Sequence, residues 1–108
     1  MPNSFHLFAN YLSFVALTEK LLRKHDYEGI YQVASFHPDY CFAGDDIHDA
    51  ANYTNRSPYP MLHILREESI AQAVKNYANA HEITQRNVNF AREKGEAYMK
   101  MLRDACLR

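Results

Sequence analysis

Between residues 36 and 66 the sequence concentrates side chains that can take part in chemistry. The segment reads FHPDYCFAGDDIHDAANYTNRSPYPMLHILR and contains three histidines, four aspartates, two arginines and one cysteine. Imidazole and carboxylate groups can transfer protons or bind metals, and guanidinium groups bind phosphate and carboxylate. The sequence therefore places a candidate site here, although none of its spacings is a motif for one reaction.

Two histidines of this segment, His37 and His63, are the candidates for acid–base catalysis. Together with Asp39 they also form a mixed nitrogen and oxygen ligand set of the kind that zinc, manganese or iron(II) accepts. The segment lacks an HExxH motif and paired cysteines, which would be more specific, and histidines more often serve as hydrogen-bonded packing residues. A divalent metal held by His37, Asp39 and His63 is therefore one hypothesis, and a structural role is the alternative.

An anion site is the second hypothesis. Ser57 followed by Pro58 is a typical helix start, with serine as the N-cap and proline at the first helical position. A helix N-terminus presents unpaired N–H groups to an anion, and Arg56 directly precedes it. The residues expected to bind a small anionic ligand are Asn52, Asn55, Arg56, Ser57 and Arg66. The alternative is that the polar side chains only form turns and the cap.

Arg66 falls within the apolar stripe of the helix expected after Ser57. A guanidinium there either extends along its stem to solvent or pairs with an acid. A structural pair with the acidic loop is favoured over a substrate clamp, and the nearest acids in sequence are Asp45, Asp46 and Asp49. Cys41 is a third chemical candidate, as a nucleophile, but a buried free thiol is favoured.

The elements around the segment must position these groups. Apolar residues recur at helical spacing from about Phe5 to Lys24, and Ile30 to Phe36 is rich in β-branched and aromatic residues. Two further helices are expected, at about 57–78 and 82–107. The predicted fold is α+β and mainly helical, in the order helix, strand, polar loop, helix, helix.

The single predicted strand needs a partner, because its backbone N–H and C=O groups cannot pair with themselves. Residues 51–54 are the other extended candidate, but they are short and polar. The alternatives are a strand from another copy or from a segment that this chain lacks. We therefore expect a homodimer or higher oligomer in which strands pair across chains.

Composition fits one domain, residues 1–108, with enough apolar residues for one core. A net charge of −1 gives no field that would gather nucleic acid. No apolar run approaches the ~20 residues of a membrane span, and no signal peptide pattern is present. Cys41 and Cys106 form no CxxC pair. We expect a cytoplasmic protein with reduced thiols that binds neither nucleic acid nor membranes.

Two adjoining stretches, QVASFHPDYCFAG at 32–44 and DDIHDAANYTNRSPYPMLHILREESI at 45–70, resemble the bacterial family known as domain of unknown function 1415. The NYTNRSPYP string, Asn52 to Pro60, is the most specific part, and the first and last helices match more loosely. The resemblance implies an uncharacterised protein. It also implies that the family's N-terminal portion, with further strands, is absent here.

The sequence is compatible with three functions. In the first, the chain is an enzyme, or the remnant of one, that acts on a small anionic substrate. Alternatively it is a non-catalytic binding module that uses the same segment, or a structural module that forms homo-oligomers through its strand edge.

Overall fold

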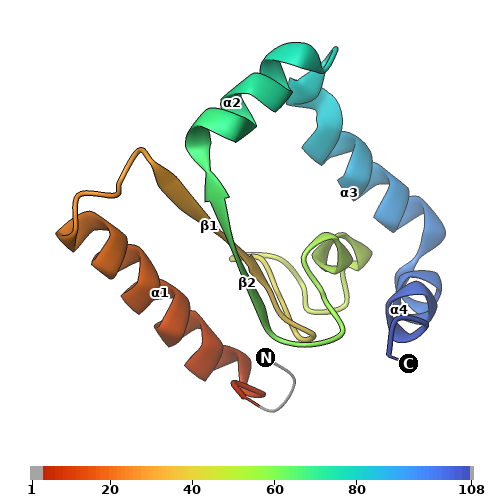
Figure 1. Ribbon diagram of the computed structural model, residues 1–108. Helices are drawn as coiled ribbons and strands as arrows, with labels where there is room; N and C mark the ends of the chain where they lie inside the picture. Colours follow the sequence, from red (N-terminus) through yellow and green to blue (C-terminus); the bar gives the residue numbers. More distant parts are fainter. Residues whose placement is uncertain (1–3, 108) are drawn as a thin grey trace.

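The computed structural model describes residues 4–107. Its elements, in chain order, are α1 (Phe8–Lys24), β1 (Tyr31–Phe36), the 3-10 helix η1 (Ala50–Thr54), β2 (Met61–Arg66), α2 (Glu67–Asn76), the 3-10 turn η2 (Ala80–Glu82), α3 (Ile83–Lys94) and α4 (Glu96–Asp104). The fold is α+β and mainly helical, as the sequence predicts. In Figure 1, α1 lies on one side of a central two-stranded sheet, and α3 and α4 lie on the other.

The main difference from the sequence-based prediction is β2, which lies where a helix was expected. It pairs antiparallel with β1, in a register that runs from Tyr31 opposite Arg66 to Phe36 opposite Met61. The prediction of a strand without a partner in its own chain is therefore wrong. Residues 51–54, the other extended candidate, belong to η1 and do not form a strand.

Pro60 explains why no helix starts at Ser57. A residue before proline is held in the extended region, so Tyr59 cannot continue a helix begun at Pro58. The Ser57 hydroxyl donates to the Tyr59 carbonyl in a turn, and it caps no helix. The chain therefore leaves the turn extended, and its apolar residues join the sheet.

The second difference lies at Gly95, which divides the single helix expected over 82–107. The φ angle of Gly95 is 87°, a left-handed conformation that glycine adopts at little cost. Its N–H donates to the Ala91 carbonyl and closes the last turn of α3. The chain then changes direction and begins α4.

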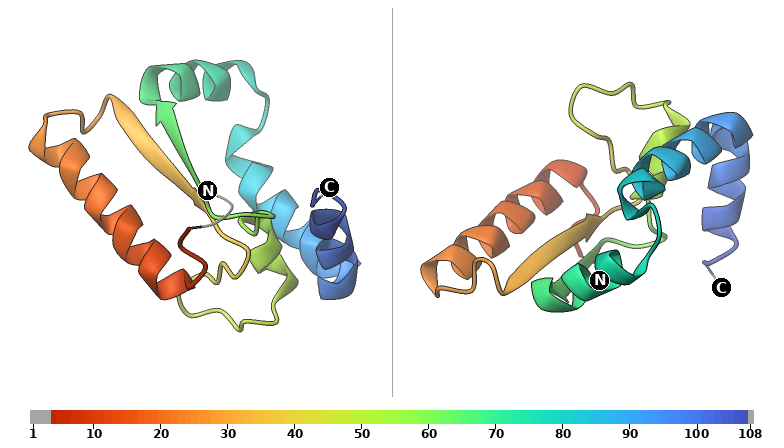
Figure 2. Two further views of the ribbon diagram at one scale, coloured as in Figure 1. Left: turned by 60° about the horizontal axis from the view of Figure 1, so that its bottom comes forward. Right: turned by 90° about the horizontal axis from the view of Figure 1, so that it is seen from above.

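Few residues of the described chain are buried. Helix α1 packs against β1 and buries only Tyr11 and Val15. Helices α3 and α4 pack mainly on η1, and both α2 and α4 bury no residue completely. In the views of Figure 2, α2 bridges between the sheet and α3. Among residues 4–107, no helix has both the length and the apolar character needed to cross a bilayer.

Tyr11 fastens α1 to the end of the sheet. Its fully buried hydroxyl accepts a hydrogen bond from the Phe36 N–H at 2.8 Å and donates one to the Met61 carbonyl. Phe36 and Met61 are the last pair of the ladder, so one hydroxyl group links the helix to both strands. Burial raises the pKa of the Tyr11 hydroxyl, because the ionised form would lose its hydration.

We expect Tyr11→Phe to lower the free energy of unfolding by about 1–3 kcal/mol, because two buried backbone groups lose their partner. The raised pKa adds a pH dependence. The stabilisation is complete below the unfolded tyrosine pKa of about 10 and declines as the pH rises above it. Urea unfolding at neutral pH and above pH ~10 measures both effects.

The matched control for this prediction is Tyr27→Phe, at a tyrosine that is about half exposed. Its hydroxyl forms no hydrogen bond among the described residues, so this change should cost little. Equal losses in the two variants would contradict the role given to Tyr11.

Candidate functional site

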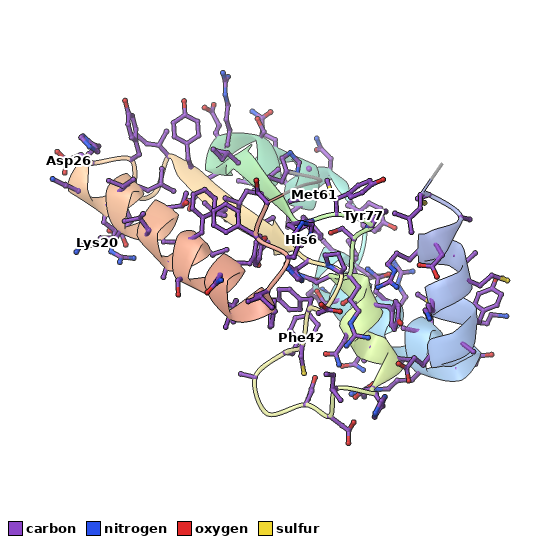
Figure 3. All side chains as sticks on the ribbon, turned by 90° about the horizontal axis from the view of Figure 1, so that it is seen from below. His6, Lys20, Asp26, Phe42, Met61 and Tyr77 are labelled. Carbon is purple, nitrogen blue, oxygen red and sulfur yellow. The ribbon has the colours of Figure 1, made fainter. Side chains whose placement is uncertain are left out.

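The polar segment 37–60 folds around η1, and its side chains bond mainly to backbone groups of the segment itself. Asp49 caps η1 by accepting a hydrogen bond from the Ala51 N–H at 2.9 Å. Asn52 is fully buried, accepts from the Phe42 N–H at 3.0 Å and donates to the Asp46 carbonyl at 2.9 Å. One amide group thus closes the loop that begins at Phe42 and projects away from the helices in Figure 3.

Asn55 connects η1 to the C-terminal end of β1. Its side-chain amide donates to the Ser35 carbonyl at 2.9 Å, and its main-chain carbonyl accepts from the His37 N–H at 3.2 Å. Backbone groups of successive residues in a strand point to opposite edges. Because the Phe36 N–H points toward Tyr11 and β2, the Ser35 carbonyl and the His37 N–H point to the edge of β1 that faces away from β2. Asn55 therefore occupies the outer edge of β1 at this end.

His37, predicted as a catalytic group and metal ligand, is fully buried. Its Nδ1 accepts from the Asp39 N–H at 3.0 Å, and its Nε2 lies 2.8 Å from the Phe5 carbonyl. The network assigns the neutral tautomer with the proton on Nε2, which satisfies both nitrogens. The ring also packs against Phe8 and Tyr11. His37 is therefore a hydrogen-bonded packing residue with no lone pair free for a metal.

Asp39 meets His37 through its backbone N–H, but the three predicted metal ligands do not form a metal-binding cluster within residues 4–107. Among residues 4–107, no three His, Cys, Asp or Glu side chains lie close enough to hold a metal ion. His63 is exposed on β2 and borders a mainly apolar hollow of about 490 Å³ lined by Phe36, Ser57, Met61, Leu62 and His63. The structure thus gives the two histidines different surroundings.

The acidic loop does pair with an arginine, but the arginine is Arg92 on α3. Its Nη2 lies 2.9 Å and its Nε 3.2 Å from the two carboxylate oxygens of Asp49, a bidentate contact. Arg92 lowers the pKa of Asp49, and Asp49 raises the pKa of Arg92. Arg66, the predicted partner, lies exposed at the end of β2 instead of on an inward helix face. No sequence spacing pointed to Arg92.

Arg56 is held inside the loop. Its Nε donates to the Tyr40 carbonyl and its Nη2 to the Ile47 carbonyl, both at 2.8 Å. Its guanidinium carbon lies 4.7 Å from the centre of the Tyr53 ring, and that of Arg103 from α4 lies 5.4 Å from the same ring. The two arginines thus share one aromatic side chain.

Both arginines border a cleft of about 410 Å³ between the loop and α4, called here the arginine cleft. It is lined by Pro38, Asp39, Ile47, His48, Tyr53, Arg56, Glu96, Lys100 and Arg103. Lys100 and Arg103 were missed as site residues. Their spacing from Glu96, four and seven positions, places all three on one helix face and was the available signal.

A second hollow, of about 420 Å³, is lined by Phe42, Asp45, Ala51, Thr54, Asn55, Thr84, Asn87, Val88 and Arg92. The predicted anion-binding residues Asn55 and Arg56 therefore line different hollows. Asn52 and Ser57 are buried and bonded to backbone. The anion site predicted at a helix start is not formed, because no helix starts there.

Cys41 is partly buried, and its thiol lies 3.4 Å from the Asp45 carbonyl and 3.6 Å from the Phe42 carbonyl. No basic side chain is among these contacts, which fits the structural thiol that the sequence favours. Cys41 and Cys106 are both free cysteines, as expected.

The chain belongs to the family described as Protein of unknown function (DUF1415), whose sequence model matches residues 1–101. The match confirms the resemblance drawn from residues 32–70 and extends it to nearly the whole chain. No curated protein and no solved structure matches the chain.

Asn52→Ala should lower the free energy of unfolding by about 2–4 kcal/mol, because the Phe42 N–H and the Asp46 carbonyl lose their partner. Thermal or urea unfolding measures the loss. Asn89→Ala is the matched control, since Asn89 is exposed on α3 and its side chain bonds, within the described part of the chain, to the exposed Gln85. A loss no larger than that of the control would show that Asn52 does not hold the loop.

Asp49→Asn should remove part of the loss of stability in acid. The pKa of Asp49 is lowered in the folded state, chiefly by its hydrogen bonds to Arg92. Its stabilisation is therefore complete above the unfolded aspartate pKa of about 3.9 and disappears as the pH falls below it. Urea unfolding over this range should give a shallower acid decline for the variant, whereas Asp26→Asn should follow the wild type. Parallel profiles for all three proteins would argue against the Asp49–Arg92 pair.

Proposed function

Starting from its membership of the DUF1415 family, we propose that the chain is a non-catalytic assembly module that pairs with a second copy of itself through the free edge of β2. The observation that carries this proposal is the amount of surface that the single chain leaves exposed.

The chain is more open than a compact monomer of its mass. It exposes 7824 Å², whereas a 12.6 kDa monomer is expected to expose about 6,200 Å². Its radius of gyration is 15.2 Å, against about 13 Å expected for 108 residues. If each of two copies buried the surface that it exposes beyond this expected value, the interface would bury about 3,200 Å² in total, which is within the range of obligate homodimers.

The edge of β2 offers the pairing groups. Within the described part of the chain, the backbone groups of β2 bond to β1 and to the Tyr11 hydroxyl, and nothing pairs with the outer edge of β2. The outer edge of β1 is occupied at one end by Asn55. An open edge readily accepts another strand. A twofold axis would align β2 antiparallel to its copy and give the strand order β1-β2-β2-β1.

Apolar side chains accompany this edge. Ile64 is 57% exposed and Met61 44% exposed, and Met61 lines the hollow of about 490 Å³ together with Phe36 and Leu62. The interior of β2 contains neither proline nor lysine, the residues that commonly protect a free edge. A second copy would remove this apolar surface from water.

Catalysis has weaker support. Both ring nitrogens of His37 are engaged, and the exposed His63 lies beside a mainly apolar hollow whose lining includes no acidic residue. No predicted pair of acid and base is therefore available to a substrate.

Ile64→Lys should convert a dimer into a monomer at micromolar concentration, because pairing would bring an ammonium group of each copy to the same apolar interface. Light scattering and sedimentation measure the mass, and circular dichroism checks the fold. Val74→Lys is the matched control, since Val74 is 53% exposed on α2, outside the strand. A stable wild-type monomer at these concentrations would overturn the proposal.

A further inference from the structure

We propose that the arginine cleft binds a small anion with a phosphate or carboxylate group, through Arg56, Lys100 and Arg103. This function is additional to self-association. The site differs from the one predicted at a helix start, because two of its three cations come from α4.

The main reason is that Arg56 is a partly buried cation whose hydrogen bonds go to neutral groups. Its partners are the carbonyls of Tyr40 and Ile47 and the ring of Tyr53, and among residues 4–107 it forms no ion pair. A cation taken partly out of water is costly unless an anion compensates it. Two of its five N–H groups serve these carbonyls, which leaves donors for a ligand.

Arg103 is held in place beside Arg56. Its Nη1 donates to the Pro38 carbonyl at 2.8 Å, and its Nε and Nη2 contact the Asp104 carboxylate, both at 3.1 Å. The Tyr53 ring further restricts both guanidinium groups. Planar groups that are already oriented lose little freedom when they bind an oxyanion.

Lys100 adds a third charge from the same side of the cleft. It is exposed and forms no ion pair among the described residues. Two carboxylates also line the cleft, Asp39 and Glu96, and Glu96 lies 3.5 Å from the His48 ring. Arg103 is paired with Asp104, but Arg56 and Lys100 have no carboxylate partner among the described residues, and these two unpaired cations favour an anion over a metal cation.

The size of the cleft limits the ligand. A volume of about 410 Å³ is within the range of small-molecule sites. The net charge of the chain is −1, so the molecule has no general attraction for a polyanion such as nucleic acid. The structure thus favours a compact anion over a polyanion.

The hollow of about 420 Å³ beside α3 is a weaker candidate. Arg92 is the one basic residue in its lining and is paired with Asp49, whereas the arginine cleft also has Arg56 and Lys100, which form no ion pair among the described residues. The hollow beside α3 therefore specifies no class of ligand.

The test titrates the full chain with inorganic phosphate and, separately, with succinate, and follows amide shifts by NMR. We expect saturable shifts at millimolar ligand that map to the loop and to α4. Tighter binding of phosphate would assign the cleft to phosphorylated ligands, and tighter binding of succinate to carboxylates.

Lys100→Ala should weaken binding about fivefold, the effect of one exposed ion pair. Its matched control, Lys75→Ala, removes the same charge from the exposed face of α2 and should leave binding unchanged. Arg103→Lys keeps the charge but loses the planar fork, and should also weaken binding. Both α4 changes lie outside β2, so the oligomeric state should persist. Equal affinities in the Lys100 and Lys75 variants, or no saturable shift, would overturn the proposal.

Discussion

The hydrogen bonds of Asn55 are the constraint on which the arrangement of this molecule depends. They join η1, on which α3 and α4 pack, to the end of β1, which α1 covers. The neighbouring Asn52 closes the loop before η1 by the same means, a buried amide that pairs with backbone groups. Because neither half has a large core of its own, the hydrogen bonds of Asn55 to Ser35 and His37 are a main link that holds the two halves together.

This arrangement changes the meaning of the dense polar segment between residues 36 and 66. Most of its polar side chains form hydrogen bonds with backbone groups of a compact loop, because the loop has little regular secondary structure to pair those groups. His37, Asn52 and Ser57 are used in this way and are buried. Arg56 is the exception, since its charge remains uncompensated at the border of a cleft that α4 completes. Structural and binding roles thus coexist in one string of sequence.

The shallow core has a second consequence. A chain that leaves α2 and α4 without a buried residue depends on few apolar contacts, and the open edge of β2 adds unpaired backbone groups. Association with a second copy would address both features together, because edge pairing and apolar burial would occur at one interface. The arginine cleft lies on other elements, so ligand binding and assembly can be separated experimentally.

The sequence by itself determined the α+β class, the helix that contains Tyr11, the strand before His37 and the segment where polar groups gather, because these follow from local periodicity and composition. It could not determine β2. The local Ser57–Pro58 signal favours a helix, whereas Pro60 and the need of β1 for a hydrogen-bonding partner favour a strand. That partner becomes evident only when β1 and β2 pair in the folded chain. Only the tertiary structure decided that Arg92 meets Asp49 and that α4 brings cations to Arg56. Such contacts depend on how distant elements pack, and no local spacing encodes them.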